Sequence, residues 1–367
     1  MKEIKPADTI IRDVCKVKKN ERVLIIANPE TNLIAEAIYE ASRAVDAQTV
    51  LLYQSAKAAF DEASAETIAA IATNPDVCIS VSSSKLGKDA NGIAHPYKTE
   101  SGEEFDHVFD YLLHGKKTMR AIWMPGMTSD MYERAVQIDY KELAKRARDL
   151  EKAFENATSV HVTASGGTDI VIPIANRKAM SDNGDFSKAG TGGNVPAGEV
   201  FISPQLGNGS DFGANGKIVY DGSMTFGDGD ALLEKPITIF VEHGFITKIE
   251  GDAEANRLKK TISEAEAKAL ALEKDGKLPK GMGEIYKKNA RNIGELGIGL
   301  NPAALITGNM LEDEKAFRTC HFAIGENYDN DAPSLIHLDG VVKNPTIVLH
   351  YENASDKTIL QAGELAV

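Results

Sequence analysis

The sequence predicts an α/β N-terminal domain with a parallel sheet, followed by an α+β C-terminal domain built on antiparallel strands. Three observations predict this fold class. The chain has 367 residues, which suits two domains of roughly 150 residues each. Strand-sized apolar runs alternate with helical patterns up to about residue 156. Beyond that point, alternating strand patterns turn back on glycines, as antiparallel hairpins do. We therefore expect domains at residues 1–156 and 157–367.

The first half alternates strands with helices. Thr31 is suited to cap the first helix, whose apolar residues recur at helical spacing. The pair Asn74-Pro75 ends the second helix. Strands that are separated by helices pair in parallel, because each helix carries the chain back to the edge where it started. The expected strands are 23–27, 50–53, 77–81 and 121–124. Three helices are expected: one that starts at residue 31, one over 63–73 and one over 139–156.

The second half begins with two hairpin patterns. Residues 159–175 alternate apolar and polar side chains around Gly166-Gly167, and residues 237–249 do so around His243-Gly244. Helical spacing of apolar residues then covers 253–272 and 282–289, and a strand pattern covers 346–351. Strands joined by tight turns are antiparallel, which distinguishes this half from the first.

Composition and charge exclude several classes of function. The chain carries 54 carboxylates against 41 Lys and Arg, a net charge of −13 that disfavours nucleic acid and membrane surfaces as partners. No apolar run approaches the roughly 20 residues of a membrane-spanning helix. The first 20 residues lack the apolar core of a signal peptide. Three widely separated cysteines are typical of a reducing compartment, so we expect a cytoplasmic protein.

No nucleotide-binding motif is found in the sequence. The first expected strand ends in Asn28-Pro29-Glu30 instead of a glycine-rich turn, and neither G-x-G-x-x-G nor G-x-x-x-x-G-K opens a helix. The glycine-rich segment 190–193 has no strand pattern before it, and we interpret it as a turn.

Possible metal ligands gather in the second half. His337 and Asp339 are two residues apart, so in an extended strand both side chains point to the same face. An imidazole beside a carboxylate forms half of a site for a borderline metal ion such as zinc. A simple His–Asp hydrogen bond on a sheet explains the same pair.

Three further segments each offer one ligand in an apolar setting. Glu295 stands in a glycine-rich stretch, where a surface loop is the alternative. His321 precedes a small apolar run, where a buried structural histidine is the alternative, and Glu199 lies between a turn and an apolar strand. Together with His337 and Asp339 they make a set of two His, one Asp and two Glu, which is typical of dinuclear hydrolases.

The order of these motifs resembles that of the thermophilic aminopeptidase T family of metallopeptidases. The matching segments are Asn194–Phe201, Gly294–Pro302, Asp313–Lys315, His321–Gly325 with Tyr328, and His337–Asp339. The resemblance implies that the metal ligands are Glu199, Glu295, His321, His337 and Asp339, and that Tyr328 is an active-site tyrosine. It also implies a homodimer that releases N-terminal residues from peptides. The segment Asp313–Lys315 either supports the ligands or forms the charged surface at the start of a helix.

The physical roles follow from the residue types. Two divalent ions such as zinc, cobalt or manganese would activate a water molecule and polarise a peptide carbonyl. Glu295 is the candidate bridge, because the two oxygens of a carboxylate can face two cations. Tyr328 could donate its hydroxyl to a developing oxyanion.

Several departures from the longer aminopeptidases keep a second interpretation open. Only eight residues separate Tyr328 from His337, Gly340 follows Asp339, and Gly198 precedes Glu199. These changes lie around the pocket and could alter substrate access. The Leu300-Asn301-Pro302 segment and the strand that begins at Pro345-Thr346 resemble a shorter branch of the superfamily that includes non-haem iron 2,5-dihydroxypyridine dioxygenases. There, one iron ion held by two His and one Asp opens an aromatic ring, and His321, His337 and Asp339 could form such a triad. A relative with another or no catalytic activity is the third hypothesis.

Overall fold

The computed structural model describes residues 5–58 and 61–367, which form two compact units. The N-terminal unit comprises Met1–Ala144 and Asp182–Ala197, and the C-terminal unit comprises Lys145–Ser181 and Gly198–Val367. The chain therefore passes between the units three times, whereas the expected division at residue 156 passes once. The difference arises because residues 182–197 return to the N-terminal unit through one strand.

The N-terminal unit is built on a five-stranded sheet in the order β10-β6-β3-β1-β2, and all four strand pairs are parallel. The predicted α/β class is thus confirmed. Its strands are β1 (Arg22–Ala27), β2 (Gln48–Tyr53), β3 (Val77–Val81), β6 (Arg120–Trp123) and β10 (Gly192–Asn194). Its helices include α1 (Pro6–Thr9), α2 (Asn32–Arg43), α3 (Ala65–Ala72), α4 (Ala90–Ala94), α5 (Val108–Asp110) and α6 (Ser129–Ala135), and β4 (Tyr97–Lys98) pairs with β5 (Glu104–Phe105).

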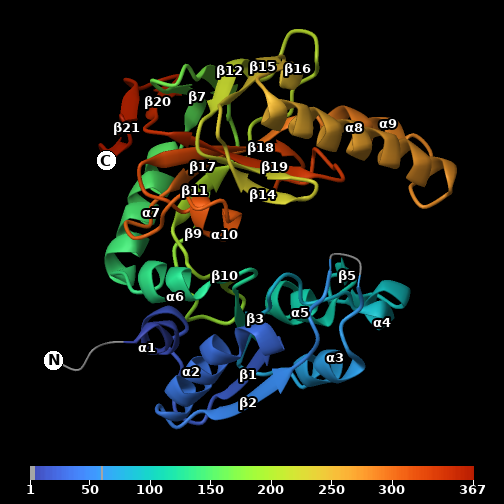
Figure 1. Cartoon of the computed structure of the whole chain (residues 1–367), viewed down its shortest axis with the longest axis vertical. Coiled ribbons are helices and arrows are strands. Elements are labelled where there is room, and N and C mark those ends of the chain that lie inside the picture. The colour runs from blue at the N-terminus through green and yellow to red at the C-terminus, as the bar shows by residue number, and fades with distance from the viewer. Residues whose placement is uncertain (1–4, 59–60) are drawn as a thin grey trace. The chain divides into compact units, whose positions relative to one another are not determined.

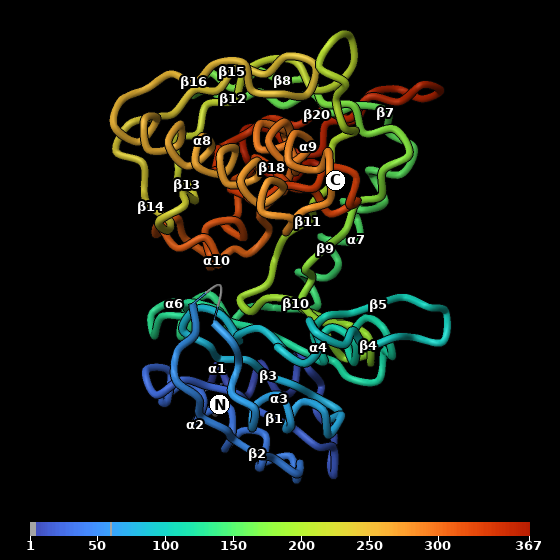
Figure 2. The backbone as a smooth tube through the Cα atoms, turned by 90° about the vertical axis from the view of Figure 1, so that its right-hand side faces the viewer, coloured from blue at the N-terminus to red at the C-terminus, as the bar shows by residue number. Residues whose placement is uncertain are grey.

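The glycine-rich segment 190–193 corrects one prediction. Its second half is not part of a turn, because Gly192 and Gly193 begin β10, which pairs in parallel with β6. Figure 2 shows this returning segment beside the strands of the N-terminal unit. A side chain at Gly192 would lie 2.6 Å from the carbonyl oxygen of Ala121, so the close pairing requires glycine.

The C-terminal unit contains two larger sheets with mostly antiparallel pairing, as predicted. The seven-stranded sheet has the order β14-β13-β19-β18-β17-β11-β9, and the eight-stranded sheet has the order β16-β15-β12-β8-β7-β20-β21-β22. The strands of the first are β9 (Met180–Asp182), β11 (Glu199–Ile202), β13 (Ser223–Phe226), β14 (Gly229–Leu232), β17 (Ile293–Gly299), β18 (Thr319–Gly325) and β19 (His337–Lys343). Those of the second are β7 (Ala157–Thr163), β8 (Asp169–Pro173), β12 (Asn215–Tyr220), β15 (Ile237–Glu242), β16 (Phe245–Glu250), β20 (Thr346–Tyr351), β21 (Lys357–Gln361) and β22 (Glu364–Leu365).

Both predicted hairpins are present, as β7–β8 and β15–β16. The helices here are α8 (Ala253–Lys274), α9 (Met282–Asn289) and α10 (Met310–Asp313), and α7 (Tyr140–Phe154) spans the division between the units. Helix α8 packs against α9 and against β13, β15 and β16 (Figure 1). No helix in the described part of the chain combines the length and apolar character that crossing a bilayer requires.

Strands β17 and β18 are buried along their whole length. One face of these strands carries large apolar side chains such as Leu296 and Phe322, which are fully buried. This face meets the eight-stranded sheet, where the hydroxyl of Tyr220 in β12 donates to the carbonyl oxygen of Phe322 at 3.4 Å. The core of the unit therefore fixes one face of the sheet, and the opposite face is left for polar residues.

Candidate metal centre

The five predicted ligands lie on one face of four adjacent strands. In the antiparallel register, Glu199 of β11 pairs with Gly299, and His321 of β18 pairs with Gly297 of β17. Residues that pair directly across an antiparallel ladder point to the same face. Asp339 of β19 pairs with Ala323, which also pairs with Glu295. The structure thus brings together residues that are up to 140 positions apart, which no local sequence pattern could show.

Small residues between the ligands make room for them. A side-chain carbon at Gly297 would lie 2.0 Å from Nε2 of His321, so the imidazole occupies the space above this glycine. Cys320, next to His321, points to the opposite face, as its place in an extended strand predicts. The glycines that made this stretch resemble a loop are therefore needed in a buried strand that carries polar side chains.

Glu295 lies at the centre of the polar face, with one imidazole at each carboxylate oxygen. Its Oε1 is 3.3 Å from Nε2 of His321, and its Oε2 is 3.3 Å from Nε2 of His337. The same Nε2 of His337 lies 3.4 Å from Oδ1 of Asp339. Glu295 thus lies between the two imidazoles, and its role as a bridge between two ions stays a prediction. Ligand atoms of Glu295, His337 and Asp339 lie within 4.8 Å of one another, close enough to share one metal ion.

Buried oxygen atoms without a hydrogen bond show that this polar face fits a cation. Oδ1 of Asp339 and Oε2 of Glu199 are buried and form no hydrogen bond, although imidazole nitrogens lie 3.4 and 3.5 Å away. His337 Nδ1 lies 2.9 Å from the carbonyl oxygen of Glu326. An Nδ1–H donating to that oxygen leaves the Nε2 lone pair facing the carboxylates, as in many metal-bound histidines. Buried acceptors that face one another require a cation between them, and two imidazoles with two carboxylates suit zinc, iron or manganese.

The pKa values also indicate that the buried carboxylates favour a positive charge beside them. Burial disfavours the charged form of His321, but its hydrogen bond to Glu295 and the charge of that residue raise its pKa to about 9. Burial also opposes ionisation of Asp339, yet His337 lowers the pKa of that carboxyl to about 2. The pKa of Glu295 is lowered against the effect of burial by the two imidazoles. The imidazoles therefore take up protons in this site unless a metal ion supplies the charge.

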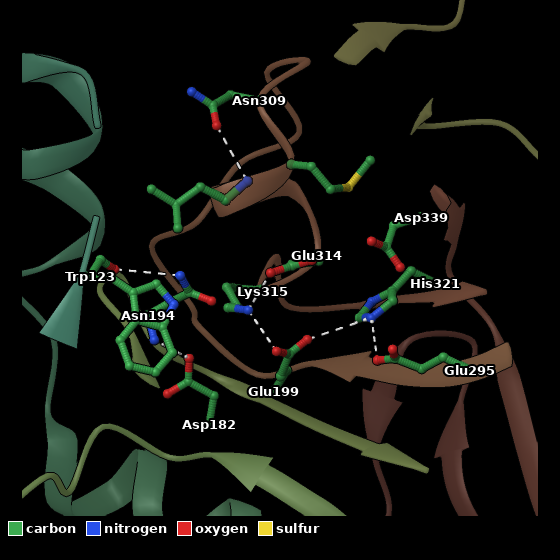
Figure 3. A network of polar contacts seen from close by, with 12 residues as sticks. Trp123, Asp182, Asn194, Glu199, Glu295, Asn309, Glu314, Lys315, His321 and Asp339 are labelled. Carbon is green, nitrogen blue, oxygen red and sulfur yellow. Dashed lines mark hydrogen bonds and ion pairs between the residues drawn. The ribbon is translucent and has the colours of Figure 1, made fainter. Parts of the chain in front are cut away.

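A second group of possible ligands lies beside the first and contains a residue outside the predicted set. Glu199, Glu314 and His321 have ligand atoms within 4.8 Å of one another. Figure 3 shows the ammonium group of Lys315 between the two carboxylates of this group. Lys315 Nζ donates to Oε1 of Glu199 at 2.6 Å and also to Glu314. Burial raises the pKa of Glu314 to about 8, although the charge of Lys315 lowers it.

The segment Asp313–Lys315 thus belongs to the interior of the unit. Of the two interpretations left open, the charged helix surface is wrong for these residues, because Asp313 and Lys315 are fully buried. Asp313 accepts hydrogen bonds from the backbone amides of Thr307 and Gly308 at 2.7 and 2.9 Å, which fixes the preceding turn. In the sequence, the only indication that these residues are buried was that the run of charges lies close to an apolar strand. Such a run is most often exposed.

Tyr328 lies at the open side of the polar face, with 54% of its surface exposed. Its ring centroid is 5.4 Å from that of His337 and 5.0 Å from that of Phe201. Desolvation of the phenol and the negative charge of Glu295 raise its pKa above the usual value. The hydroxyl therefore stays protonated at neutral pH and is able to donate a hydrogen bond.

The family is decided by a comparison with family models. Residues 11–366 match the model of 2,5-dihydroxypyridine 5,6-dioxygenase. The chain belongs to this family. A curated 2,5-dihydroxypyridine 5,6-dioxygenase of Pseudomonas putida strain KT2440 is 26% identical over 238 residues, which cover 60% of this chain and 58% of that protein. The match thus spans less than two thirds of the curated relative.

Solved structures show that the dioxygenase family shares its fold with aminopeptidase T. The 2,5-dihydroxypyridine dioxygenase from Pseudomonas putida KT2440 superposes with a TM-score of 0.68 at 17% identity, covering 98% of this chain and 96% of that one. Wild-type AmpT from Thermus thermophilus superposes with a TM-score of 0.67 at 15% identity, covering 99% and 98%. The predicted relation to aminopeptidase T is therefore shown for the fold, while the family is the one that the sequence offered as the alternative.

Proposed function

We propose that this chain is a metal-dependent dioxygenase that opens a dihydroxylated pyridine or a closely related aromatic ring. The family supports this proposal, since its model matches nearly the whole chain. The observation that carries it is the convergence of His321, His337 and Asp339 around Glu295 on one sheet face. Two histidines and one carboxylate are the ligand set of many non-haem iron oxygenases. Iron bound by these residues would supply the activation of O₂.

The surrounding side chains would hold and orient the substrate. Phe201 and Tyr328 form a pair of aromatic rings beside His337, and such rings favour a flat aromatic partner through offset or edge contacts. The protonated hydroxyl of Tyr328 would donate to an oxygen substituent of the ring. Glu295, held between the imidazoles, would keep both rings oriented toward the metal.

Oxygen consumption tests this function. The purified protein, loaded with Fe(II), is mixed with 2,5-dihydroxypyridine in an oxygen electrode, and the loss of the ring absorbance is followed in parallel. We expect one O₂ consumed per ring opened, and no turnover by the His337→Ala variant. Ring loss without O₂ uptake, or equal turnover by that variant, would contradict the proposal.

A dinuclear aminopeptidase is the second candidate, and one observation favours it. The group of Glu199, Glu314 and His321 lies beside the first group and offers ligands for a second ion. In that case zinc, cobalt or manganese would be bound, and an amino-acid amide would be hydrolysed without O₂. Release of a free amino acid by the metal-loaded protein would favour this candidate over the first. The homodimer, the peptide partner and the cytoplasmic location remain predictions from the sequence.

A further inference from the structure

Lys315 differs from other lysines in the described chain by its complete burial beside possible metal ligands. Its side chain is 0% exposed, and the Glu199 and Glu314 side chains that it contacts are 10% and 17% exposed. Removing an ammonium group from water is costly unless opposite charges and hydrogen bonds replace the solvent. Lys315 obtains both from carboxylates that also face His321 or lie close to it. The ammonium is therefore held at the position where the second group would hold a cation.

We propose that Lys315 serves as a built-in cation that replaces a second metal ion and so limits the centre to one ion. Oε1 of Glu199 already accepts a hydrogen bond from Lys315 at 2.6 Å. A metal ion bound to the same oxygens would come within a few ångströms of the ammonium, and two like charges at that distance repel strongly in a buried site. In the first group the ion pairs of Glu295 and Asp339 are formed with imidazoles, which a metal ion can use as ligands, so this group is the metal position.

The charges of the two groups support this division. With neutral imidazoles, Glu295 and Asp339 give the first group a charge of −2, which one divalent ion balances. In the second group, the ammonium of Lys315 already offsets negative charge of Glu199 and Glu314, so less charge is left for a metal ion to balance. Hydrolases with paired ions need both positions and single-iron oxygenases need one, so a centre limited to one ion fits the second chemistry. This inference rests on the proposed metal centre but not on the dioxygenase reaction.

The count of bound ions tests the role of Lys315. The full-length protein is stripped with a chelator, equilibrated with Zn²⁺ as the probe, freed of unbound metal and measured by elemental analysis. We expect one zinc ion per chain in the wild type and two in Lys315→Met, whose side chain has a similar length but no charge. Lys315→Arg keeps the charge and is the matched control, with one ion expected. Because Lys315→Met risks misfolding, Lys315→Gln is measured in parallel, and circular dichroism confirms that each variant is folded.

The outcomes separate this inference from the proposed function. Two zinc ions in the wild type would overturn it, because Lys315 would then not exclude the second ion. One ion in the folded neutral variants would also overturn it, since Lys315 would then be a structural ion pair only. A wild type that binds no zinc and no iron would instead overturn the metal centre itself. Failure of the oxygen-uptake assay with one ion bound would leave the role of Lys315 intact and contradict only the reaction.

Discussion

The two groups of possible ligands on this sheet face contain similar residues but differ in how their charge is balanced. In the first group, Glu295 and Asp339 form their ion pairs with imidazoles. In the second, the carboxylates of Glu199 and Glu314 are both paired with the ammonium of Lys315. The comparison teaches that a cluster of ligands indicates a metal site only when no side chain already supplies the positive charge.

The largest expected effect is the loss of the metal from the first group. Replacing His337 by Ala removes one imidazole and leaves Asp339 without its partner, so we expect metal affinity to fall on the order of 100-fold or more. Elemental analysis after dialysis measures this loss. The matched control is Glu314→Gln in the second group, which should keep one ion per chain. Equal metal content in the His337→Ala and Glu314→Gln variants would show that the first group is not the preferred metal position.

A substitution at Gly297 tests the space that both groups share. A methyl group at this position would lie 2.0 Å from Nε2 of His321, a residue that belongs to both sides of the site. We expect Gly297→Ala to destabilise the protein by about 1–3 kcal/mol in denaturant unfolding and to weaken metal binding. Gly227→Ala, where the nearest atom is 3.3 Å away on the Thr261 side chain, should change neither by a comparable amount. Wild-type metal affinity in Gly297→Ala would show that His321 is not a ligand.

Tyr328 lies beside the first group, and its substitution tests whether it acts on the substrate or on the metal ion. Its ring contacts His337 of the first group, and its hydroxyl remains protonated because its pKa is raised. We expect Tyr328→Phe to reduce kcat by roughly 100-fold, the low end of the effect of a single positioned proton donor, while the ring contact and the bound metal are retained. Turnover measurements with paired metal analyses check this. A loss of metal from Tyr328→Phe would mean that the residue acts on the centre and not on the substrate.

The smallest expected effect concerns Cys320, which lies next to His321 but on the opposite face. Burial disfavours the thiolate and raises the thiol pKa far above its usual value near 8.5. At pH 8 the folded protein should therefore resist alkylation at Cys320, and the unfolded chain should react. Mass spectrometry of iodoacetamide-treated protein, with and without metal, measures this. Faster alkylation after metal removal would place the thiol on the ligand face.

Local patterns in the sequence predicted much of the fold. The apolar runs and helical spacings of the first half gave the parallel sheet correctly, because each element there has its own periodicity and length. The hairpins β7–β8 and β15–β16 were equally visible through their turns. Strand β17 was harder to recognise, since Gly294, Gly297 and Gly299 suggested a loop where the structure has a buried strand.

The candidate site was predicted in part. The five proposed ligands converge, but their convergence depends on strand register between distant segments, which the order of motifs in a related family indicated and periodicity did not. Lys315 was not predicted to pair with Glu199, because the two residues are 116 positions apart and a run of three charges is usually exposed. Its burial is a tertiary effect, produced by the segment after α10 folding over the polar face. The choice between one ion and two therefore required the structure.

The number and identity of metal ions in the wild-type protein, purified without chelator, test the central claim most directly. Elemental analysis with protein concentration from amino-acid analysis gives ions per chain. The account predicts one iron ion per chain, held by His321, His337 and Asp339 beside Glu295. Two zinc, cobalt or manganese ions per chain would contradict it and would favour the dinuclear aminopeptidase.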